Sequence, residues 1–446
     1  MFFGCALFFA ATMMGQTELT IDGTQKGAPI NPSLYGLFFE EINHAGDGGL
    51  YAELIRNRSF EDNAKTPECW HATGNAQISL ISKTLLNQVQ KQALHISLPS
   101  ATSRTSLSGV TNEGFWGIHA VKGRTYTLNL WMRAAKGYTG KVYASLQNAN
   151  GTKKYAQTMF ANIGKNWKKY TTTITATDND NAASFGLQFD RAGEVDIDMV
   201  SLFPPTFKNR KNGLRKDLAQ LLYDDKPAFI RFPGGCYVEG VGSYENAFQW
   251  KHTIGPIEQR PGHENKVWGY RSSDGLGFDE YLQMCEDLHA APLFVVNIGL
   301  GHEYLIPVND LQPYIQNTLD ALDYANGTTT TPMGALRAKN GHPKPYGIKY
   351  IELGNENYQA GNDARSSQYP ERYNLFRKAI AARYPEIKII GNVEAWGTDS
   401  PSWRNDYPVD FLDEHYYRSY SWMRNNFTKY DHYARGKQLI YNGEYA

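Results

Sequence analysis

Short apolar runs that end in polar residues recur along most of the chain, and they predict buried strands. Such runs lie at residues 34–40, 228–235, 292–299, 349–353, 387–391, 409–415 and 438–441. Segments with helical spacing of their apolar positions lie between several of these runs, at residues 50–57, 278–288, 311–325 and 369–382. Strands that alternate with helices indicate βα units and a parallel sheet.

The stretch between residues 67 and 205 has a different pattern. Apolar and polar positions alternate at residues 125–133, 141–146, 170–175 and 194–203, and clusters of Gly, Asn and Asp separate these segments. None of the segments in this stretch has convincing helical spacing. Short alternating strands at this spacing predict an antiparallel all-β sandwich.

The order of the segments predicts how the two parts are combined. If the run at 34–40 is the first strand, six more parallel strands follow after the sandwich, and polar residues end nearly all of them. This favours an α/β fold, a (β/α)₈ TIM barrel that lacks its eighth unit. Residues 17–62 then form the first βα unit, 67–205 an inserted sandwich, and 206–446 barrel strands two to seven. The alternative is an open doubly wound sheet, but no Gly-x-Gly-x-x-Gly follows a strand.

Composition narrows the class of protein. At 446 residues, two or three domains are expected. Lys plus Arg and Asp plus Glu both number 45, so no basic face for nucleic acid is indicated. Aromatic residues make up 13%, which suits stacking on sugar rings, although aromatic side chains also fill cores.

The first 16 residues are predicted to be a signal-like leader. They are apolar and too short to span a bilayer, so we expect a secreted or periplasmic protein without a membrane span. The four cysteines, at positions 5, 69, 236 and 285, are spaced too irregularly to indicate a metal cluster or a disulfide scaffold.

The predicted strand ends carry a set of polar side chains, and in a barrel these would meet at one face. The set comprises Glu40, Glu41, Cys236, Asn297, Asn355, Glu356, His415, Tyr417 and Glu444. It lacks the two or three histidines at ligand spacing that a zinc site would need, and it lacks a phosphate-binding loop and a Gly-x-Ser-x-Gly elbow. Two carboxyl groups with nearby polar donors suit glycoside hydrolysis.

The separation of the two carboxyl groups would decide the stereochemical outcome. About 5–5.5 Å gives retention through a covalent intermediate, and about 6.5–9.5 Å gives inversion. Each residue also has a plainer explanation when taken alone. Glu356 could be an anion at a helix N-terminus, His415 a hydrogen-bonded rim residue and Cys236 a small buried side chain. Their common place at the ends of successive strands favours a shared site.

Several longer motifs resemble those of the α-L-arabinofuranosidases of glycoside hydrolase family 51. They are the run from Leu34 to Glu61, Ile230-Arg-Phe-Pro-Gly-Gly-Cys236, the runs 250–263 and 268–280, Glu352-Leu-Gly-Asn-Glu-Asn-Tyr358, Asp413-Glu-His-Tyr-Tyr417 and Gly443-Glu-Tyr-Ala446. The sandwich resembles, through weaker motifs, the carbohydrate-binding jelly roll that is inserted in many of these enzymes.

The resemblance implies a retaining hydrolase that releases terminal α-L-arabinofuranosyl groups from arabinan, arabinoxylan or derived oligosaccharides. It implies that Glu356 is the acid/base and Glu444 the nucleophile. Glu40, Cys236 and Asn355 match positions that contact the arabinose hydroxyls, while His415 and Tyr417 match positions near the two carboxylates. Asn297 is an adjacent substrate-binding candidate. No metal or organic cofactor is implied, and because relatives often assemble, a homo-oligomer is an open expectation.

The chain departs from the family pattern at its end. Family members continue past the nucleophile with an eighth βα unit and a C-terminal β-sandwich, which are absent here, so we expect the 446-residue chain alone to be poorly soluble or inactive. Two other functions stay open. One is a different retaining barrel glycosidase, such as a β-xylosidase or an endoglucanase. The other is a non-catalytic carbohydrate-binding protein that uses Trp116, Trp131 or Trp167 as stacking platforms.

Overall fold

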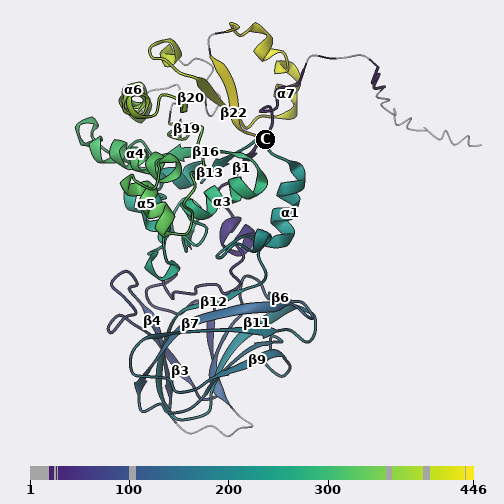
Figure 1. The fold of residues 1–446 in the computed structure, drawn as a ribbon, viewed down its shortest axis with the longest axis vertical. Helices are drawn as coiled ribbons and strands as arrows, with labels where there is room; N and C mark the ends of the chain where they lie inside the picture. The colour runs from purple at the N-terminus through teal and green to yellow at the C-terminus, as the bar shows by residue number, and fades with distance from the viewer. Residues whose placement is uncertain are drawn as a thin grey trace, which may run out of the picture.

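The chain folds into two parts that lie end to end in a computed structural model (Figure 1). The structure describes residues 20–24, 27, 29–99, 107–357, 364–394, 402–436 and 438–446. The predicted leader lies outside the described residues. One part is built on a parallel sheet with helices around it, and the other consists of packed antiparallel sheets.

A parallel sheet of seven strands carries the first part. Its order is β1, β13, β16, β19, β20, β21, β22, so each strand pairs with its neighbours in sequence order, as the apolar runs predict. The strands are Leu37–Phe38, Phe229–Phe232, Ala291–Val296, Tyr350–Leu353, Lys388–Glu394, Phe411–Tyr416 and Leu439–Tyr445. The sheet curls into a nearly closed barrel, because Arg231 of β13 reaches Glu444 of β22, five strands away in the sheet order.

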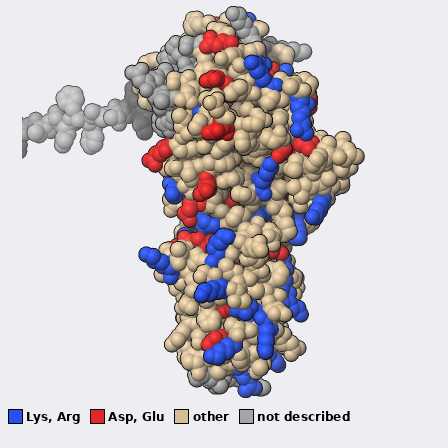
Figure 2. Space-filling view, turned by 90° about the vertical axis from the view of Figure 1, so that its left-hand side faces the viewer, with Lys and Arg blue, Asp and Glu red and all other residues tan. Residues whose placement is uncertain are grey.

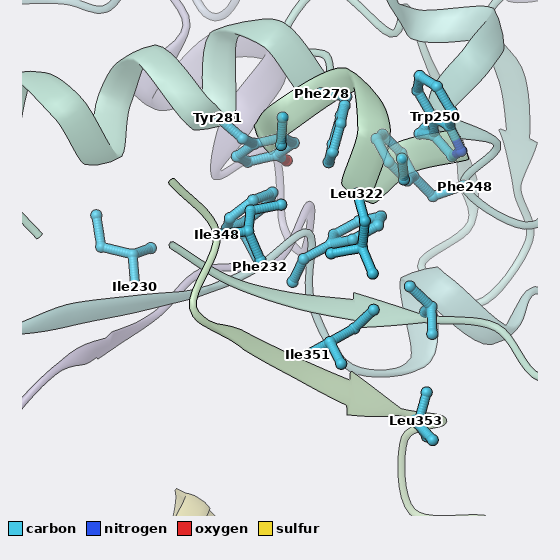
Figure 3. Close-up of a cluster of buried hydrophobic side chains, with 14 of the residues drawn as sticks. Ile230, Phe232, Phe248, Trp250, Phe278, Tyr281, Leu322, Ile348, Ile351 and Leu353 are labelled. Carbon is cyan, nitrogen blue, oxygen red and sulfur yellow. The ribbon is translucent and has the colours of Figure 1, made fainter. Parts of the chain in front are cut away.

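Helices cover the outside of this barrel and share a core with the outward-facing side chains of its strands. The helices are α1 Lys216–Asp225, α2 Cys236–Glu239, α3 Phe278–Leu288, α4 Gln312–Asn326, α5 Pro332–Lys339, α6 Ala364–Arg383 and α7 Tyr420–Asn426. Figure 3 shows side chains of this core from the strands, Ile230, Phe232, Ile351 and Leu353, together with Phe278 and Tyr281 of α3. The predicted helices at 278–288, 311–325 and 369–382 correspond to α3, α4 and most of α6.

The inside of the barrel holds the alternate positions of the same strands. At one level these are apolar: Leu293, Val295 and Ile390 form a small buried cluster, with Phe229, Tyr350, Phe411 and Tyr441 packed against it. Towards the carboxyl ends of the strands the interior is charged, with Arg231, Glu352 and Asp413 almost completely buried. This charged level supports the site described below.

The second part is a sandwich of antiparallel sheets, and its described residues between β2 and β12 form strands without a helix. One sheet has the order β10-β7-β12-β4-β3, and the other has the order β2-β5-β11-β8-β9 with β6 paired to β11. Their facing side chains form a separate apolar core. The strands are Trp70–Thr73, Gln77–Ile81, Ala93–Leu98, Ser108–Asn112, Ile118–Ala120, Thr125–Lys136, Val142–Gln147, Lys154–Phe160, Lys168–Thr175, Asp180–Phe189 and Gly193–Phe203.

The helix predicted for residues 50–57 is wrong. Only Gly46–Leu50 is wound, with non-helical backbone angles inside it, and the following residues are extended or in turns. Their backbone hydrogen bonds go to distant segments instead: Ala52 N–H donates to Gly213, and Leu54 N–H donates to Leu202. Tyr51, Ala52 and Ile55 are buried, so the apolar spacing reflects tertiary packing and not helix periodicity.

Charged side chains of both signs are scattered over the face shown in Figure 2. Within the described residues, no helix has both the length and the apolar character that a bilayer crossing requires. The remaining strands form two short hairpins, β14 His263–Asn265 with β15 Tyr270–Ser272, and β17 Leu300–Gly301 with β18 Tyr304–Leu305.

Candidate functional site

Glu356 lies just beyond β19, in a turn that directs it back over the barrel. Gly354 and Glu356 have φ angles of 82° and 48°, a left-handed conformation that is uncommon for a glutamate. Such strained backbone occurs preferentially at functional sites. The Glu356 Oε1 atom lies 2.8 Å from Nδ1 of His415, which comes from β21. The Glu356 side chain is buried next to this imidazole.

Glu444 lies near the end of β22, next to His415 in the strand register. Its Oε1 accepts a hydrogen bond of 2.7 Å from Nη1 of Arg231, and its Oε2 accepts one of 2.7 Å from the hydroxyl of Tyr417. Burial alone would raise the pKa of Glu444. The charges of Arg231 and His415 and the Tyr417 hydrogen bond outweigh burial and hold the pKa below its usual range. Glu444 is therefore an anion at neutral pH.

The two carboxylates are close together. One oxygen of Glu356, one oxygen of Glu444 and a ring nitrogen of His415 lie within 4.8 Å of one another. The His415 Nδ1 atom is 3.8 Å from Oε2 of Glu444 as well as 2.8 Å from Glu356. This spacing fits the shorter of the two separations that distinguish glycoside-hydrolysis mechanisms, about 5–5.5 Å.

His415 is a cation that lies between the acidic side chains of Asp413 and Glu356. Burial lowers its pKa, but the charge of Asp413 and hydrogen bonds to Asp413 and Glu356 raise the pKa well above its usual value. Asp413 lies 2.7 Å from Nε2 of His415. Burial raises the pKa of Asp413, and the His415 charge and hydrogen bond overcome this and lower it to about 2. Both ring nitrogens of His415 therefore carry protons. Nε2–H donates to Asp413, and Nδ1–H donates to Glu356.

Arg231 supports the site from the barrel interior. Its guanidinium donates to both oxygens of Glu352, at 2.6 and 3.1 Å, and to Oδ1 of Asn355 at 2.8 Å. Burial raises the pKa of Glu352 to about 8, although the charge of Arg231 opposes this. Because Arg231 also donates to Glu444, a single fully buried side chain fixes Asn355 and Glu444 relative to each other.

Glu40 and Cys236 form another side of the site. The Oε1 atom of Glu40 accepts hydrogen bonds from the Tyr237 N–H at 2.8 Å and from the Trp268 indole at 3.0 Å. Burial raises the pKa of Glu40 to about 7. Burial, followed by the charges of Glu239, Glu40, Glu356 and Glu444, raises the pKa of the Cys236 thiol, which therefore stays neutral.

The glycines before Cys236 make room for this arrangement. A Cβ at Gly235 would lie 2.8 Å from Oε1 of Glu444 and 3.3 Å from Oδ1 of Asn355. At Gly234, which has a φ of 139°, a Cβ would lie 2.5 Å from Cγ of Glu40. The Pro-Gly-Gly sequence therefore lets the turn that follows β13 approach the Glu40 and Glu444 side chains closely.

Asn355 is fixed by hydrogen bonds on both sides of its amide. Its Nδ2 donates to Glu239 at 3.1 Å, and its Oδ1 accepts from Arg231. Asn357 donates to the other oxygen of Glu239 at 2.7 Å. His302, in the loop after β17, lies 3.2 Å from Glu239. Glu239 of α2 therefore links Asn355 and Asn357, which follow β19, to His302 in the loop after β17.

Asn297 lies at the end of β16, as its sequence position predicts, but its amide is engaged elsewhere. Its Nδ2 donates to the backbone carbonyls of Val238 and Glu239 and to the Tyr304 hydroxyl, and its Oδ1 accepts from the Gly299 N–H. Glu41, predicted as part of the strand-end set, accepts from Asp47 N–H and from the Tyr270 hydroxyl. Both residues brace loops around the site.

The strand-end pattern missed five residues: Arg231, Glu239, Trp268, Glu352 and Asp413. Arg231, Glu352 and Asp413 occupy inward positions within strands, and a charged residue in an otherwise apolar run is the signal that could have found them. Glu239 and Trp268 lie on a short helix and in the turn of a hairpin, where periodicity gives no signal.

A cavity of about 490 Å³ adjoins the cluster and is lined by Val241, Lys266, Val267, His302 and Glu303. It adjoins the side of the site that holds Glu40 and Glu239, because His302 contacts Glu239 and Val267 precedes the Trp268 that binds Glu40. Cys236, Glu239 and His302 have donor atoms within 4.8 Å of one another, so these residues could hold a metal ion. The described cysteines at 69, 236 and 285 are free thiols.

Comparison with known families separates the same two parts. The family model described as "Alpha-L-arabinofuranosidase 1 domain" matches residues 221–435. The model described as "Carbohydrate binding domain" matches residues 52–192. The first match contains most of the parallel sheet, and the second contains most of the sandwich.

Several curated relatives are similar over nearly the whole chain. An extracellular exo-α-L-arabinofuranosidase of Streptomyces chartreusis is 38% identical, over 96% of this chain and 53% of its own length. α-L-Arabinofuranosidase 1 of Arabidopsis thaliana is 36% identical, over 96% of this chain and 63% of its own length. A probable α-L-arabinofuranosidase A of Aspergillus oryzae is 33% identical, over 95% and 67%. The chain thus spans about half to two thirds of the length of these relatives.

A solved structure is similar in fold over the same extent. The arabinose-bound MgGH51 α-L-arabinofuranosidase superposes with a TM-score of 0.85 and 35% sequence identity, covering 93% of this chain and 66% of that one. Its match extends over both the barrel and the sandwich. With the identity to the curated relatives, this shows that the chain belongs to the α-L-arabinofuranosidases of glycoside hydrolase family 51.

Proposed function

We propose that the protein is a retaining exo-acting α-L-arabinofuranosidase, in which Glu444 is the nucleophile and Glu356 the general acid and base. The observation that carries this proposal is the pair of carboxylate oxygens within 4.8 Å of one another. Glu444 suits a nucleophile because Arg231, His415 and Tyr417 keep it ionised. Such a separation leaves no space for a water molecule between the carboxylate and the sugar, as inversion would require.

In the first step, a carboxylate oxygen of Glu444 attacks the anomeric carbon of the terminal arabinofuranosyl group and forms an ester bond. The glycosidic C–O bond breaks, its electron pair goes to the leaving oxygen, and the protonated Glu356 supplies the proton. Arg231 and His415 stabilise the Glu444 carboxylate before attack. His415 also donates to Oε1 of Glu356, so one imidazole orients both carboxyl groups.

In the second step, water attacks the anomeric carbon of the arabinosyl ester. Glu356, now a carboxylate, takes the proton of that water, and the electron pair of the broken ester bond returns to Glu444. Two displacements on the same carbon restore the original anomeric configuration. Both glutamates regain their starting protonation states.

We further propose that Glu40, Cys236 and Asn355 bind the arabinose hydroxyls, with Asn355 at the 2-hydroxyl. Burial and fixed hydrogen bonds support this role, because they hold Glu40 and Asn355 in defined positions next to the two carboxylates. His415 and Tyr417 then act on Glu444. The role of Asn297 as a direct sugar contact stays a prediction, since its amide already holds the α2 loop.

Leaving-group dependence tests the roles of the two glutamates. Glu356→Ala should lower the rate on substrates with poor leaving groups by about 10²–10⁴-fold and spare an activated aryl α-L-arabinofuranoside in its first step. Azide should restore turnover by replacing water, and the product should be an arabinofuranosyl azide of the α configuration, because azide attacks the ester on Glu444 from the opposite face and brings about the second inversion. Glu444→Ala should abolish turnover.

Two outcomes would contradict these roles. Equal losses on good and poor leaving groups would exclude Glu356 as the acid. Faster cleavage of an aryl β-xyloside or of cellulose than of an aryl α-L-arabinofuranoside would favour the other barrel glycosidases. Glu245→Ala is the control, because Glu245 is an exposed glutamate outside the cluster and its removal should leave all rates unchanged.

We propose that residues 17–62 and 206–446 form the catalytic barrel and that 67–205 form an inserted carbohydrate-binding jelly roll. The two separate apolar cores support this division. The substrates would be arabinose-containing plant polysaccharides or oligosaccharides, and assembly into homo-oligomers stays a prediction. Secretion or a periplasmic location is supported by the extracellular relative from Streptomyces chartreusis.

We also propose that the opening between β22 and β1 is the place of an eighth βα unit. Both are edge strands of the described sheet, and Phe38, Leu439 and Tyr445 on them are exposed hydrophobic side chains. An added strand would pair both edges and cover these side chains. An open reading frame for a further strand and helix beyond codon 446 would support this proposal. Full activity and solubility of the 446-residue chain alone would contradict it.

A further inference from the structure

Trp116 is an exposed aromatic side chain on a strained turn of the sandwich. Its side chain is 69% exposed, which is unusual for tryptophan, and its φ angle is 59°. Gly114 and Gly117 on either side also have positive φ angles, of 66° and 103°. The turn therefore holds a large ring in solvent at the cost of backbone strain, an arrangement that indicates a function.

The exposed ring is fixed by contacts with the barrel. His44 lies edge-on to Trp116 with ring centroids 5.3 Å apart, and His44 stacks on Tyr270 at 4.0 Å with an interplanar angle of 20°. The Tyr270 hydroxyl accepts from the His44 N–H and donates to Oε1 of Glu41. Trp116, His44 and Tyr270, here called the junction platform, thus join the sandwich to the loop that follows β1.

Packing between the two parts does not require Trp116. The neighbouring Phe115 fills that role, since a Cβ at Gly48 would lie 2.5 Å from its ring. Phe115 also contacts His44, with centroids 6.0 Å apart. Phe115 therefore makes the packing contact between the two parts, and most of the Trp116 side chain stays exposed to solvent.

The junction platform is connected to the candidate site through one hairpin. Trp268, which donates to Glu40 in the site, and Tyr270, which belongs to the platform, are two residues apart at the turn between β14 and β15. Two residues span at most about 7 Å. Glu40 and His44 are likewise on one loop, four positions apart. A sugar chain that leaves the site over this hairpin would reach Trp116 after crossing a length of only a few amino-acid residues.

The surroundings of the junction platform suit a neutral sugar chain. Aromatic rings present flat apolar faces to the C–H groups of sugar rings, while polar side chains are needed for the hydroxyls. A small cavity next to the platform is lined by His44, Tyr270, Asp47, Arg56 and Arg271, which supply donors and acceptors. Charged groups of both signs are present, so the lining favours hydroxyls over a charged ligand.

We propose that the junction platform is a subsite for the main chain of an arabinofuranosyl-substituted polysaccharide, stacked on Trp116 while a terminal group occupies the site at Glu356 and Glu444. This inference rests on the proposed arabinofuranosidase function. It assigns binding of the polymer to the boundary between the two parts, with ligands from both. The platform acts on substrates long enough to reach it and has no contact with a small aryl glycoside.

The test compares polymeric and small substrates in Trp116→Ala. We expect kcat/KM on arabinoxylan or on branched arabinan to fall about fivefold to tenfold, with no change on an aryl α-L-arabinofuranoside. Retardation of the protein in gels containing the polymer should fall in parallel. Trp116→Phe should keep part of the polymer effect because it keeps a stacking face. A loss confined to one of the two polymers would identify the main chain that the platform accepts.

Met159→Ala is the control, since Met159 is another exposed apolar side chain of the sandwich and lies on strand β9. It should leave both substrates unaffected. Unchanged polymer kinetics and unchanged gel retardation in Trp116→Ala would overturn the proposal, and so would an equal loss on polymer and aryl substrate. If the full-length protein, completed by an eighth βα unit, cleaves no aryl α-L-arabinofuranoside, the proposed function fails, and gel retardation still decides whether Trp116 binds the polymer.

Discussion

At the scale of single residues, the protonation state of Glu444 depends on three neighbours. Arg231 and His415 supply positive charge, and Tyr417 donates a hydrogen bond, while burial acts in the opposite direction. Arg231 and His415 are themselves buried and paired with Glu352 and Asp413. Glu444 is therefore kept ionised by a network whose charges lie inside the barrel, where water screens them little.

Tyr417→Phe should move the acidic limb of the kcat/KM pH profile to higher pH. The change removes the hydroxyl that donates to Oε2 of Glu444 at 2.7 Å and so removes one of the interactions that lower the Glu444 pKa. Half of Tyr417 is exposed, so the variant should fold normally. The measurement is the initial rate on an aryl α-L-arabinofuranoside across the acidic range. Tyr420→Phe, at another exposed tyrosine, is the control, and a limb that stays in place in Tyr417→Phe would exclude this role.

At the scale of elements, the ends of parallel strands bring the site together, and this part could be predicted from sequence. Apolar runs predicted the seven strands in their observed order, and Glu356, His415 and Glu444 lie at or just beyond the carboxyl ends of three of them. The contacts of Glu239 and Trp268 could not be predicted, because they depend on how loops fold over the barrel. The segment after residue 50 was assigned wrongly, since its apolar spacing serves contacts with Leu202 and Gly213.

Gly235→Ala tests whether the close approach of the β13 turn matters for activity. The added Cβ would lie 2.8 Å from Oε1 of Glu444, so the carboxylate or the turn must shift. Displacement of a reacting group by about 1 Å can cost about 10²-fold in rate, and we expect kcat/KM to fall by that order. Gly164→Ala is the control, because a Cβ there has no neighbour within 4 Å. Equal activity of the two variants would contradict the expected crowding.

At the scale of the whole molecule, buried carboxyl groups make stability depend on pH. Burial raises the pKa of Glu40 to about 7, of Glu41 to about 8 and of Glu352 to about 8, from 4.5. The folded state therefore binds these protons more tightly than the unfolded chain does. The stability that they contribute is complete below pH 4.5 and is lost as the pH rises through the folded-state values. The raised pKa of His415 acts in the same direction.

Urea unfolding at pH 5 and pH 8 measures this dependence, and we expect the free energy of unfolding to be lower at pH 8. Glu40→Gln should reduce the difference, because the amide does not titrate and its oxygen can still accept from Tyr237 and Trp268. Glu245→Gln, at an exposed position, should leave the difference unchanged. A higher stability at pH 8 than at pH 5 would show that lowered carboxylate pKa values dominate instead.

The most direct measurement is mass spectrometry of Glu356→Ala after it reacts with a dinitrophenyl α-L-arabinofuranoside. The good leaving group lets the first step proceed without an acid, and the missing base slows the second step, so a covalent intermediate should accumulate. We expect a mass increase of one arabinosyl unit, located by peptide mapping on Glu444. An adduct on another residue, or release of arabinose with inverted configuration and no adduct, would contradict it.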